Sequence, residues 1–288
     1  MMKNYYKDFN FSKAKKLIEQ ALREDKGTGD ATSNLLIDKS KIYHAELLLK
    51  EDAVIAGFKI FEMVFDIVDS GVKIKKHIDE GKFYKKGTIA AEIKGNARSM
   101  LLAERLSLNL IQRMSGIATK TFKMRKLLNN DSIKLIDTRK TTPNLRLFEK
   151  LAVKIGGGAN HRFGLYDMIL IKDNHIESNG GILNTLEKLK KIKTSLKKEI
   201  EVKDLNEFQI AQIHGNGLID IVMLDNFKLQ DVKRAAEMNK RKFKIEISGG
   251  VNESNIAQYG KIKGIDFISS GALTHSVKSV DLSLNFIS

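Results

Sequence analysis

Residues 219–250 read IDIVMLDNFKLQDVKRAAEMNKRKFKIEISGG, with two short apolar runs on either side of an amphipathic stretch. The runs at 219–224 and 243–248 are rich in strand-forming residues, and 228–239 has the length and composition of a helix. Two strands joined through a helix pair in parallel, because the helix carries the chain back to the same end of the sheet. This stretch therefore predicts a βαβ unit.

The same alternation extends over the C-terminal half of the chain. Its strands are nearly continuous apolar runs, which is typical of strands covered by helices on both faces or closed into a barrel. The further expected strands are 133–137, 168–172, 199–202 and 265–269. The further expected helices are 144–155, 182–197, 205–213 and 252–260. We therefore predict an α/β fold built on parallel strands.

The N-terminal part of the chain has a different texture, and we expect an α+β domain there. Residues 12–24 have helical spacing, and the runs 42–50 and 53–57 indicate strands. Short apolar runs split by glycines at 64–94 indicate small antiparallel strands and turns. Apolar residues cover most of the surface of a helix at 99–128, so we expect it to be buried and to join two domains.

Composition excludes several classes of protein. The 288-residue chain has no Cys, which excludes a disulfide scaffold, a Cys nucleophile and thiolate metal sites, and favours the cytoplasm. No apolar run approaches the roughly 18 residues of a membrane span, and the N-terminus lacks the apolar core of a signal peptide. The 50 Lys+Arg against 35 Asp+Glu give a net charge of +15. Because 40 of the 50 are Lys, the charge indicates a solvated surface more than a nucleic-acid-binding one.

Each expected strand of the C-terminal half ends in polar or charged residues. In a barrel of parallel strands such positions converge on the carboxyl-terminal rim, where active sites lie. One or two polar strand ends are ordinary edges, but six in succession favour a functional rim. The residues are Asp137 with Arg139 and Lys140, Lys172, Glu201, Asp225, Ser248-Gly249-Gly250 and Ser269-Ser270-Gly271.

The residue types on this rim suit anionic ligands. Arg binds carboxylates through two parallel hydrogen bonds and Lys supplies a point charge for phosphate. Arg139, Lys140, Arg162 and Lys172 are therefore candidate anion ligands. Glu201 and Asp225 could hold a cation, bind sugar hydroxyls or stabilise a developing positive charge. The glycines after the last two strands favour a phosphate cradle of backbone N–H groups.

The densest segment is 137–175, which contains DTRKTTPNLR, GGGANHRFGLYD and ILIKDNH. Pro143, the only proline, lies where a loop leaves a strand, and three consecutive glycines precede the NHR motif. A lone His is more often a satisfied core residue than a ligand. The position of His161 beside Arg162 and after the glycines favours a ligand contact.

These motifs together resemble the quinolinate phosphoribosyltransferase family, which makes nicotinate mononucleotide with decarboxylation. The preceding ERLSLNLIQRMSGIAT (104–119) agrees with the family, and the resemblance runs from about Glu24 to Ser276 in the same order and spacing. Further agreement comes from EDKGTGDATS (24–33), EIEV (199–202), VMLDN (222–226), EISGGV (246–251) and DFISSGALTHS (266–276).

The resemblance implies a fold, a reaction and an assembly. It implies an N-terminal α+β open sandwich over 1–115, with the tail 277–288 a candidate to pack with it, and an incomplete α/β barrel over 116–276. The implied reaction takes quinolinate and phosphoribosyl pyrophosphate, with Mg2+, to nicotinate mononucleotide, pyrophosphate and CO2 in de novo NAD biosynthesis. The implied assembly is a homodimer, or a higher oligomer, whose active sites are shared between subunits, with neither nucleic acid nor membrane as a partner.

The resemblance also implies roles for individual residues. Lys140 would contact both substrates near the reacting centre. Glu201 and Asp225 would lie at the ribose and near a Mg2+ held through pyrophosphate, and no side chain is assigned as a direct metal ligand. The residues that would hold the quinolinate carboxylates are Arg139, His161, Arg162 and Lys172, with Arg105 from the partner subunit. The residues that would cradle the 5′-phosphate are Ser248, Gly249, Gly250, Ser270 and Gly271.

Three positions remain open to choice or depart from the family. Glu199 lies two residues before Glu201, so both side chains lie on one side of the strand; Glu201 is preferred from its place before Asp204-Leu205. Asn144 stands where the family often has Gly, and Lys203 where an acidic residue is usual. A related branch linked to molybdenum transport typically lacks the NHR and KDNH patterns present here.

Two rival functions follow from the same residues. A Schiff-base aldolase would use Lys140 or Lys172 at a strand end as its nucleophile. It explains one lysine but neither the Arg-His-Arg set nor the glycine corners. A nucleic-acid binder would use the net charge, but aromatic residues make up only 7% of the chain. A barrel that serves only as a scaffold ranks last.

Overall fold

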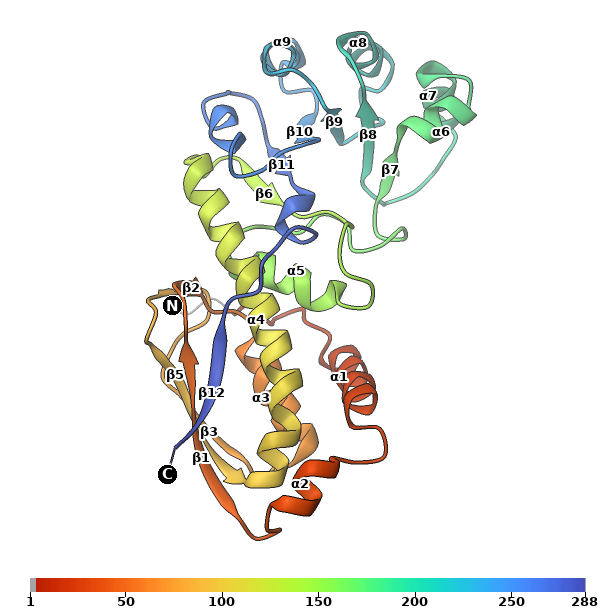
Figure 1. Ribbon diagram of the computed structural model, residues 1–288. Helices are drawn as coiled ribbons and strands as arrows, with labels where there is room; N and C mark the ends of the chain where they lie inside the picture. Colours follow the sequence, from red (N-terminus) through yellow and green to blue (C-terminus); the bar gives the residue numbers. More distant parts are fainter. Residues whose placement is uncertain (1–3, 288) are drawn as a thin grey trace. The chain divides into compact units, whose positions relative to one another are not determined.

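The computed structural model describes residues 4–287, which form two units (Figure 1). The first unit comprises the described residues up to Phe122, Thr141–Gly157 and those from Ser276 onward. The second comprises Lys123–Lys140 and Gly158–His275. The boundary expected between 115 and 116 falls inside the long helix α4, Ala97–Leu128.

The first unit contains a four-stranded antiparallel sheet in the order β12-β1-β5-β3. Its central strand β1 alternates, with Ala45, Leu47 and Leu49 buried on one face, which is the pattern of a sheet with one covered face. The C-terminal strand β12 pairs with β1, so residues from both ends of the chain build this sheet. The strands are β1 Ile42–Leu49, β3 Lys73–Lys76, β5 Ile89–Asn96 and β12 Leu282–Ile287. A separate two-stranded sheet consists of β2 Ala53–Val54 and β4 Phe83–Tyr84.

Helices make up the rest of the first unit, and one of them corrects the sequence prediction. Residues 64–68 were expected in strands and turns, but they are the last turn of α3, Phe58–Val68. Phe58, Phe61 and Phe65 are buried at helical spacing, so the apolar period is helical and not alternating. The other helices of this unit are α1 Phe11–Lys26, α2 Ala31–Leu36, α5 Arg146–Ile155 and the first part of α4.

The helix α4 is buried as expected and is tied to its neighbours by polar contacts. Thr119 Oγ1 accepts a hydrogen bond from the Val54 N–H at 2.9 Å. The Arg113 guanidinium forms a 2.8 Å ion pair with the fully buried Glu149 of α5. A Cβ at Gly116 would lie 2.3 Å from the Lys278 carbonyl oxygen, so only glycine allows the C-terminal segment to pass this close.

The second unit is a six-stranded parallel sheet in the order β6-β11-β10-β9-β8-β7. The strands β6 and β7 lie at its two edges, which makes an open, incomplete α/β barrel and confirms the predicted fold class. Figure 1 shows α7, α8 and α9 along one side of this sheet. The strands are β6 Lys134–Ile136, β7 Ile169–Ile171, β8 Lys198–Val202, β9 Ile221–Asp225, β10 Lys244–Ser248 and β11 Phe267–Ser269. The helices are α6 Asp173–Ser178, α7 Ile182–Lys190, α8 Leu205–His214 and α9 Leu229–Asn239, with the 3₁₀ turns η1 Ile256–Tyr259 and η2 Gly271–Leu273.

The helix expected at 252–260 is a second correction, since only the short η1 forms there. The Asn252 side chain accepts hydrogen bonds from the Ser254 N–H and hydroxyl at 2.9 and 2.6 Å. Side chains that bond to nearby backbone groups in this way compete with helix hydrogen bonds.

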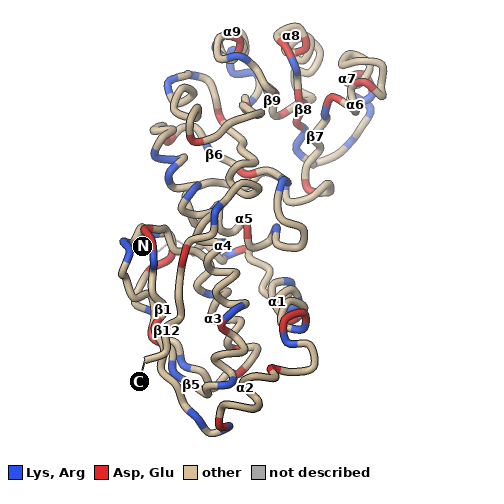
Figure 2. The backbone as a smooth tube through the Cα atoms, viewed as in Figure 1, with Lys and Arg blue, Asp and Glu red and all other residues tan. Residues whose placement is uncertain are grey.

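Two further findings bear on the classes considered above. Within residues 4–287, no helix is long and apolar enough to cross a membrane. Figure 2 shows Lys and Arg on segments throughout both units.

Candidate active site

The parallel register of the second unit brings the polar strand ends to one edge of the sheet. Asp225 at the end of β9 is in register with Ser248 at the end of β10. Glu201 lies on β8 opposite Met223 of β9, and Lys172 directly follows β7. The edge therefore carries cations, carboxylates and the glycine corners within one sheet.

Lys172 and Glu201 form an ion pair at this edge. The Lys172 Nζ lies 2.8 Å from Glu201 Oε2, with 46% of the lysine side chain and 10% of the glutamate side chain exposed. The KDNH motif explains the placement, because His175 Nδ1 accepts the Lys172 N–H at 3.0 Å and fixes the turn into α6. The Lys172 side chain is therefore already engaged with a carboxylate at this edge, as expected of a carboxylate ligand.

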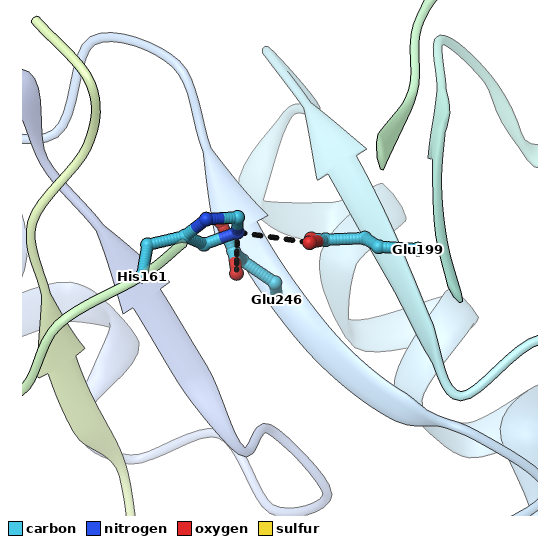
Figure 3. Close-up of side chains that lie close together, drawn as sticks. All are labelled: His161, Glu199 and Glu246. Atoms are coloured by element: carbon cyan, nitrogen blue, oxygen red, sulfur yellow. Dashed lines mark hydrogen bonds and ion pairs between the residues drawn. The ribbon is translucent and has the colours of Figure 1, made fainter. Parts of the chain in front are cut away.

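Deeper in the same sheet, His161 meets two buried glutamates (Figure 3). Its Nε2 lies 2.8 Å from Glu199 Oε2 on β8 and 3.5 Å from Glu246 Oε2 on β10. Both glutamates are fully buried. Burial raises the pKa of Glu199 to about 7. Burial and the neighbouring charge of Glu199 raise the pKa of Glu246 to about 8.

Asp137 positions the NHR motif. This residue directly follows β6 and is itself fully buried. Its carboxylate accepts the His161 N–H at 2.9 Å and the Asn160 side-chain amide at 2.6 Å. Ala159 forms a parallel bridge to Ile136, so the segment runs beside β6 as an extra short strand. The glycines before it release the chain from α5 into this extended path, with Gly157 at φ +91°.

Arg139 and Arg162 bring two like charges together. Burial lowers the pKa of the Arg162 guanidinium, and the nearby charge of Arg139 lowers it further. The Arg162 Nη1 also donates to the Met168 carbonyl at 3.3 Å. Two adjacent, partly desolvated guanidinium groups favour an anion between them, and a dicarboxylate fits this charge.

The glycine corners after β10 and β11 lie beside Asp225 and Lys140. Gly249 has φ +90°, and a Cβ there would lie 2.2 Å from Asn226 Oδ1, next to Asp225. A Cβ at Gly271 would lie 3.0 Å from Lys140 Cδ. Only glycine leaves room for these neighbours, and glycine-rich turns of this kind are typical of backbone phosphate cradles.

Two predicted serines, and two positions at which the chain departs from the family, remain to be located. Ser248 ends β10, whereas Ser270 is buried and its hydroxyl donates to the Val251 carbonyl at 2.6 Å. Asn144 has φ +64°, a left-handed conformation that Asn tolerates, which explains how it replaces a glycine. Lys203 is exposed and forms a 3.4 Å ion pair with Glu207 of α8.

Arg105 is not in the second unit, where the other predicted quinolinate ligands lie. It belongs to the first unit, on α4, and its side chain is exposed. Its predicted role in a partner's site, like the other predicted site roles, stays a prediction.

Sequence reasoning missed Glu246 and the function of Asp137. Glu246 lies between Ile245 and Ile247 in the middle of a buried strand, and a charged residue in such a run is the signal that could have found it. Asp137 was noted only as a strand end. Its contacts with Asn160 and His161 connect positions 23 and 24 residues apart, which the sequence does not show.

The chain matches two family models that together cover most of it. They are the quinolinate phosphoribosyl transferase N-terminal domain over residues 30–115 and the C-terminal domain over residues 117–285. A probable nicotinate-nucleotide pyrophosphorylase [carboxylating] of Bacillus subtilis is 41% identical over 276 residues, which is 96% of this chain and 94% of the relative. A chloroplastic Arabidopsis thaliana protein of the same activity name is also 41% identical, over 94% of this chain and 82% of the relative.

Solved structures agree with the sequence relatives. The nicotinate-nucleotide pyrophosphorylase from Francisella tularensis has a TM-score of 0.91 and 38% identity, and the match covers 100% of both chains. NadC from Streptococcus pyogenes has a TM-score of 0.91 and 37% identity, over 98% of this chain and 99% of the other.

Proposed function

The chain belongs to the quinolinate phosphoribosyltransferase family, and from this premise we propose that it makes nicotinate mononucleotide, pyrophosphate and CO2 from quinolinate and phosphoribosyl pyrophosphate. This is a decarboxylating pentosyl transfer of de novo NAD biosynthesis. The observation that carries the proposal is the gathering of cationic side chains in the second unit, where Arg139 lies near Arg162, and where Lys172 and the two glycine corners follow strand ends. Both substrates are polyanions, so these cations match them in charge.

Quinolinate binding is assigned to the cationic side of the edge. We propose that Arg139, Arg162 and Lys172 hold its two carboxylates. The ring nitrogens of His161 contact the Arg162 N–H and Glu199, so we propose that His161 acts on this pocket mainly by orienting Arg162. The phosphoribosyl end is assigned to Lys140, Asp225 and the glycine corners.

The reaction needs positioning more than a nucleophilic side chain. The quinolinate nitrogen attacks C1 of the ribose and forms the C–N bond as the C–O bond to pyrophosphate breaks. Glu201 and Asp225 stabilise the positive charge that develops on the ribose. The bond to the 2-carboxylate then breaks, CO2 leaves, and the ring cation stabilises the electron pair on the carbon until it takes a proton. Holding both substrates in line provides most of the rate.

We also propose Mg2+, a homodimer and a cytoplasmic location. Asp225 is partly exposed at the strand end, so its oxygens fit the preference of Mg2+ for oxygen ligands near pyrophosphate. When bound, the ion would neutralise charge on the departing pyrophosphate. The absence of Cys agrees with the cytoplasm. The exposed position of Arg105 on α4 is compatible with a contribution to a partner's site.

An activity assay tests the proposed function. Incubation of the protein with quinolinate, phosphoribosyl pyrophosphate and Mg2+ should give nicotinate mononucleotide and CO2 in equal amounts. Nicotinate in place of quinolinate is the matched control and should give little product, because it lacks the second carboxylate. Turnover of nicotinate without quinolinate activity would contradict the proposal.

A hybrid assay tests the shared site. Arg105→Ala and Lys140→Ala should each be nearly inactive alone, since each removes a charge from every active site. Mixed subunits should recover part of the activity, because one of the two sites in a hybrid dimer carries neither substitution. If mixing restores nothing while size-exclusion chromatography shows hybrids, Arg105 does not act across the interface.

A further inference from the structure

The cluster of His161, Glu199 and Glu246 presents a charge problem. Glu199 Oε1 and both carboxyl oxygens of Glu246 are buried and receive no hydrogen bond from a permanent donor of residues 4–287. An isolated buried carboxylate costs several kcal/mol, and two side by side also repel each other. The cluster must therefore be neutralised by a bound cation or by a proton.

The hydrogen bonds of His161 decide between these possibilities. The Arg162 N–H donates to His161 Nδ1 at 2.8 Å, so this nitrogen carries no proton. A neutral ring then has its proton on Nε2, where it donates to Glu199 at 2.8 Å. The three ligand atoms lie within 4.8 Å of one another, a spacing that a metal ion could fill. A metal on Nε2 would displace that proton and require one on Nδ1, against the Arg162 N–H.

We propose that Glu199 and Glu246 share one proton and act as positioning residues, which hold His161 as the neutral Nε2–H tautomer and thereby fix Arg162 for quinolinate. The proposal deepens the proposed function and rests on it for the role of Arg162. A proton on one carboxyl group supplies a donor for the oxygens that have none, and the two groups are placed to form that hydrogen bond. The raised pKa of each group agrees with a proton kept at neutral pH.

The charged groups that face the cluster are consistent with one shared proton. The positive charge of the Arg162 guanidinium favours one remaining negative charge in the cluster. The Arg162 N–H, which lies 2.8 Å from His161 Nδ1, acts in the same direction. Lys172 adds a weaker attraction and Glu201 a repulsion. Ser269 of β11 also faces Glu246 and lowers its pKa, while its hydroxyl donates to the Ile247 carbonyl at 3.5 Å. A single negative charge facing Arg162 is thus stabilised, and a second one is not.

A cavity reaches the cluster from the end of the sheet at which the strands begin. Its volume is about 260 Å³, and His161, Arg162 and Glu246 line it. The remaining lining includes Lys134, Lys197 and Lys244, which lie at the starts of strands and not at their carboxyl ends. The cavity offers a route by which the shared proton can exchange with solvent.

The shared proton predicts a specific pH dependence. As the pH rises through the raised pKa values, the proton leaves, the two carboxylates repel, and Arg162 loses its fixed position. The KM for quinolinate should therefore rise about tenfold between pH 7 and pH 9, while the KM for phosphoribosyl pyrophosphate changes little. The carboxyl groups of quinolinate remain ionised throughout this range, so they do not contribute to the rise.

Substitution by Gln separates the shared proton from mere packing. Glu246→Gln keeps the shape, and its amide N–H supplies a permanent donor to Glu199, so it should keep the pH 7 KM for quinolinate and abolish the rise at pH 9. Glu246→Ala should raise the KM for quinolinate about tenfold already at pH 7, with a much smaller change in kcat. Glu237→Gln, on the exposed face of α9, is the matched control and should change nothing.

A second readout does not depend on activity. Nitrogen-15 NMR of the His161 ring, assigned with His161→Asn, should show protonated Nε2 and unprotonated Nδ1 in the wild type and in Glu246→Gln at pH 7. An imidazolium or an Nδ1–H ring would overturn the proposal, as would a Glu246→Gln enzyme that keeps the pH 9 rise. If one equivalent of Zn2+ shifts these signals in the wild type but not in Glu246→Gln, the cluster is a metal site and the proposal is wrong. Lack of quinolinate turnover with the expected ring signals would instead count against the proposed function alone.

Discussion

Glu199 and Glu201 lie two residues apart on β8 and on the same side of the strand, yet their surroundings differ. Glu201 is near the strand end and forms an ion pair with Lys172, whose side chain is 46% exposed. Glu199 is one repeat deeper, fully buried, and meets His161 and the carboxyl group of Glu246. Depth along one strand therefore separates a carboxylate available for ligand chemistry from one that keeps a proton.

The difference follows from the side chains that neighbouring segments place beside each of the two glutamates. At the edge, a lysine on a flexible chain can reach the carboxylate and remain hydrated. In the interior, the partners are a neutral imidazole and a second acid, and burial penalises every ionised form. The same residue type thus has two roles because its partners differ.

The largest effect is expected at the edge. Lys172→Met removes the proposed charge-assisted contact to quinolinate and should lower kcat/KM for quinolinate on the order of 1,000-fold. The melting temperature should fall by no more than about 2 °C, because the lysine side chain is half exposed. A loss of less than tenfold, measured with saturating phosphoribosyl pyrophosphate, would show that the edge cation is not a carboxylate ligand.

In the interior, substitution should affect stability more than at the edge. Glu246→Ala leaves a cavity and deprives Glu199 of its partner, so the free energy of unfolding should fall by about 3 kcal/mol in a urea titration. Glu201→Ala should lower the same quantity by about 1 kcal/mol, since Lys172 can turn to solvent. Equal losses for the two variants would remove the proposed contrast.

The pH dependence of stability provides a smaller and more specific test. Glu199 and Glu246 have pKa values raised above those of the unfolded chain, so the folded protein keeps a proton that the unfolded chain releases. Stability from this source is fully present below about pH 4.5 and is lost as the pH rises toward 7–8. One retained proton predicts a fall of about 2 kcal/mol between pH 5.5 and pH 7. The fall should shrink in Glu246→Gln; an unchanged slope in that variant would assign it to other groups.

The smallest effect is expected at Lys203, an exposed departure from the family that directly follows β8. Lys203→Ala breaks an ion pair in which 74% of the lysine side chain is exposed. Such pairs contribute little, so unfolding should change by less than about 0.5 kcal/mol, and kcat/KM by less than twofold. A larger kinetic effect would give Lys203 a part in the site that its geometry does not indicate.

The fold could be predicted from the sequence to a large extent because its signal is local. The alternation of apolar runs and helical stretches identified all six parallel strands, and polar strand ends identified the edge with Lys172, Glu201 and Asp225. The α3 error arose where phenylalanines at helical spacing overlap a glycine-split region. The 252–260 error arose because an Asn side chain captured the backbone of a helix-like stretch.

The interior of the site could not be predicted in the same way because it depends on contacts across strands. The sequence indicated a choice between Glu199 and Glu201, and the structure shows a separate surrounding for each. Glu246 joins the cluster only because β8, β9 and β10 lie side by side, and Asp137 holds His161 only because residue 159 runs beside β6. Neither neighbour can be inferred from spacing along the chain.

We propose above all that this chain performs decarboxylating phosphoribosyl transfer to quinolinate. The most direct measurement supplies quinolinate labelled with carbon-13 in its 2-carboxyl group, together with phosphoribosyl pyrophosphate and Mg2+, and follows the label. We predict one labelled CO2 for each nicotinate mononucleotide formed, with no label in the nucleotide. Label retained in the nucleotide, or pyrophosphate release without labelled CO2, would contradict the account.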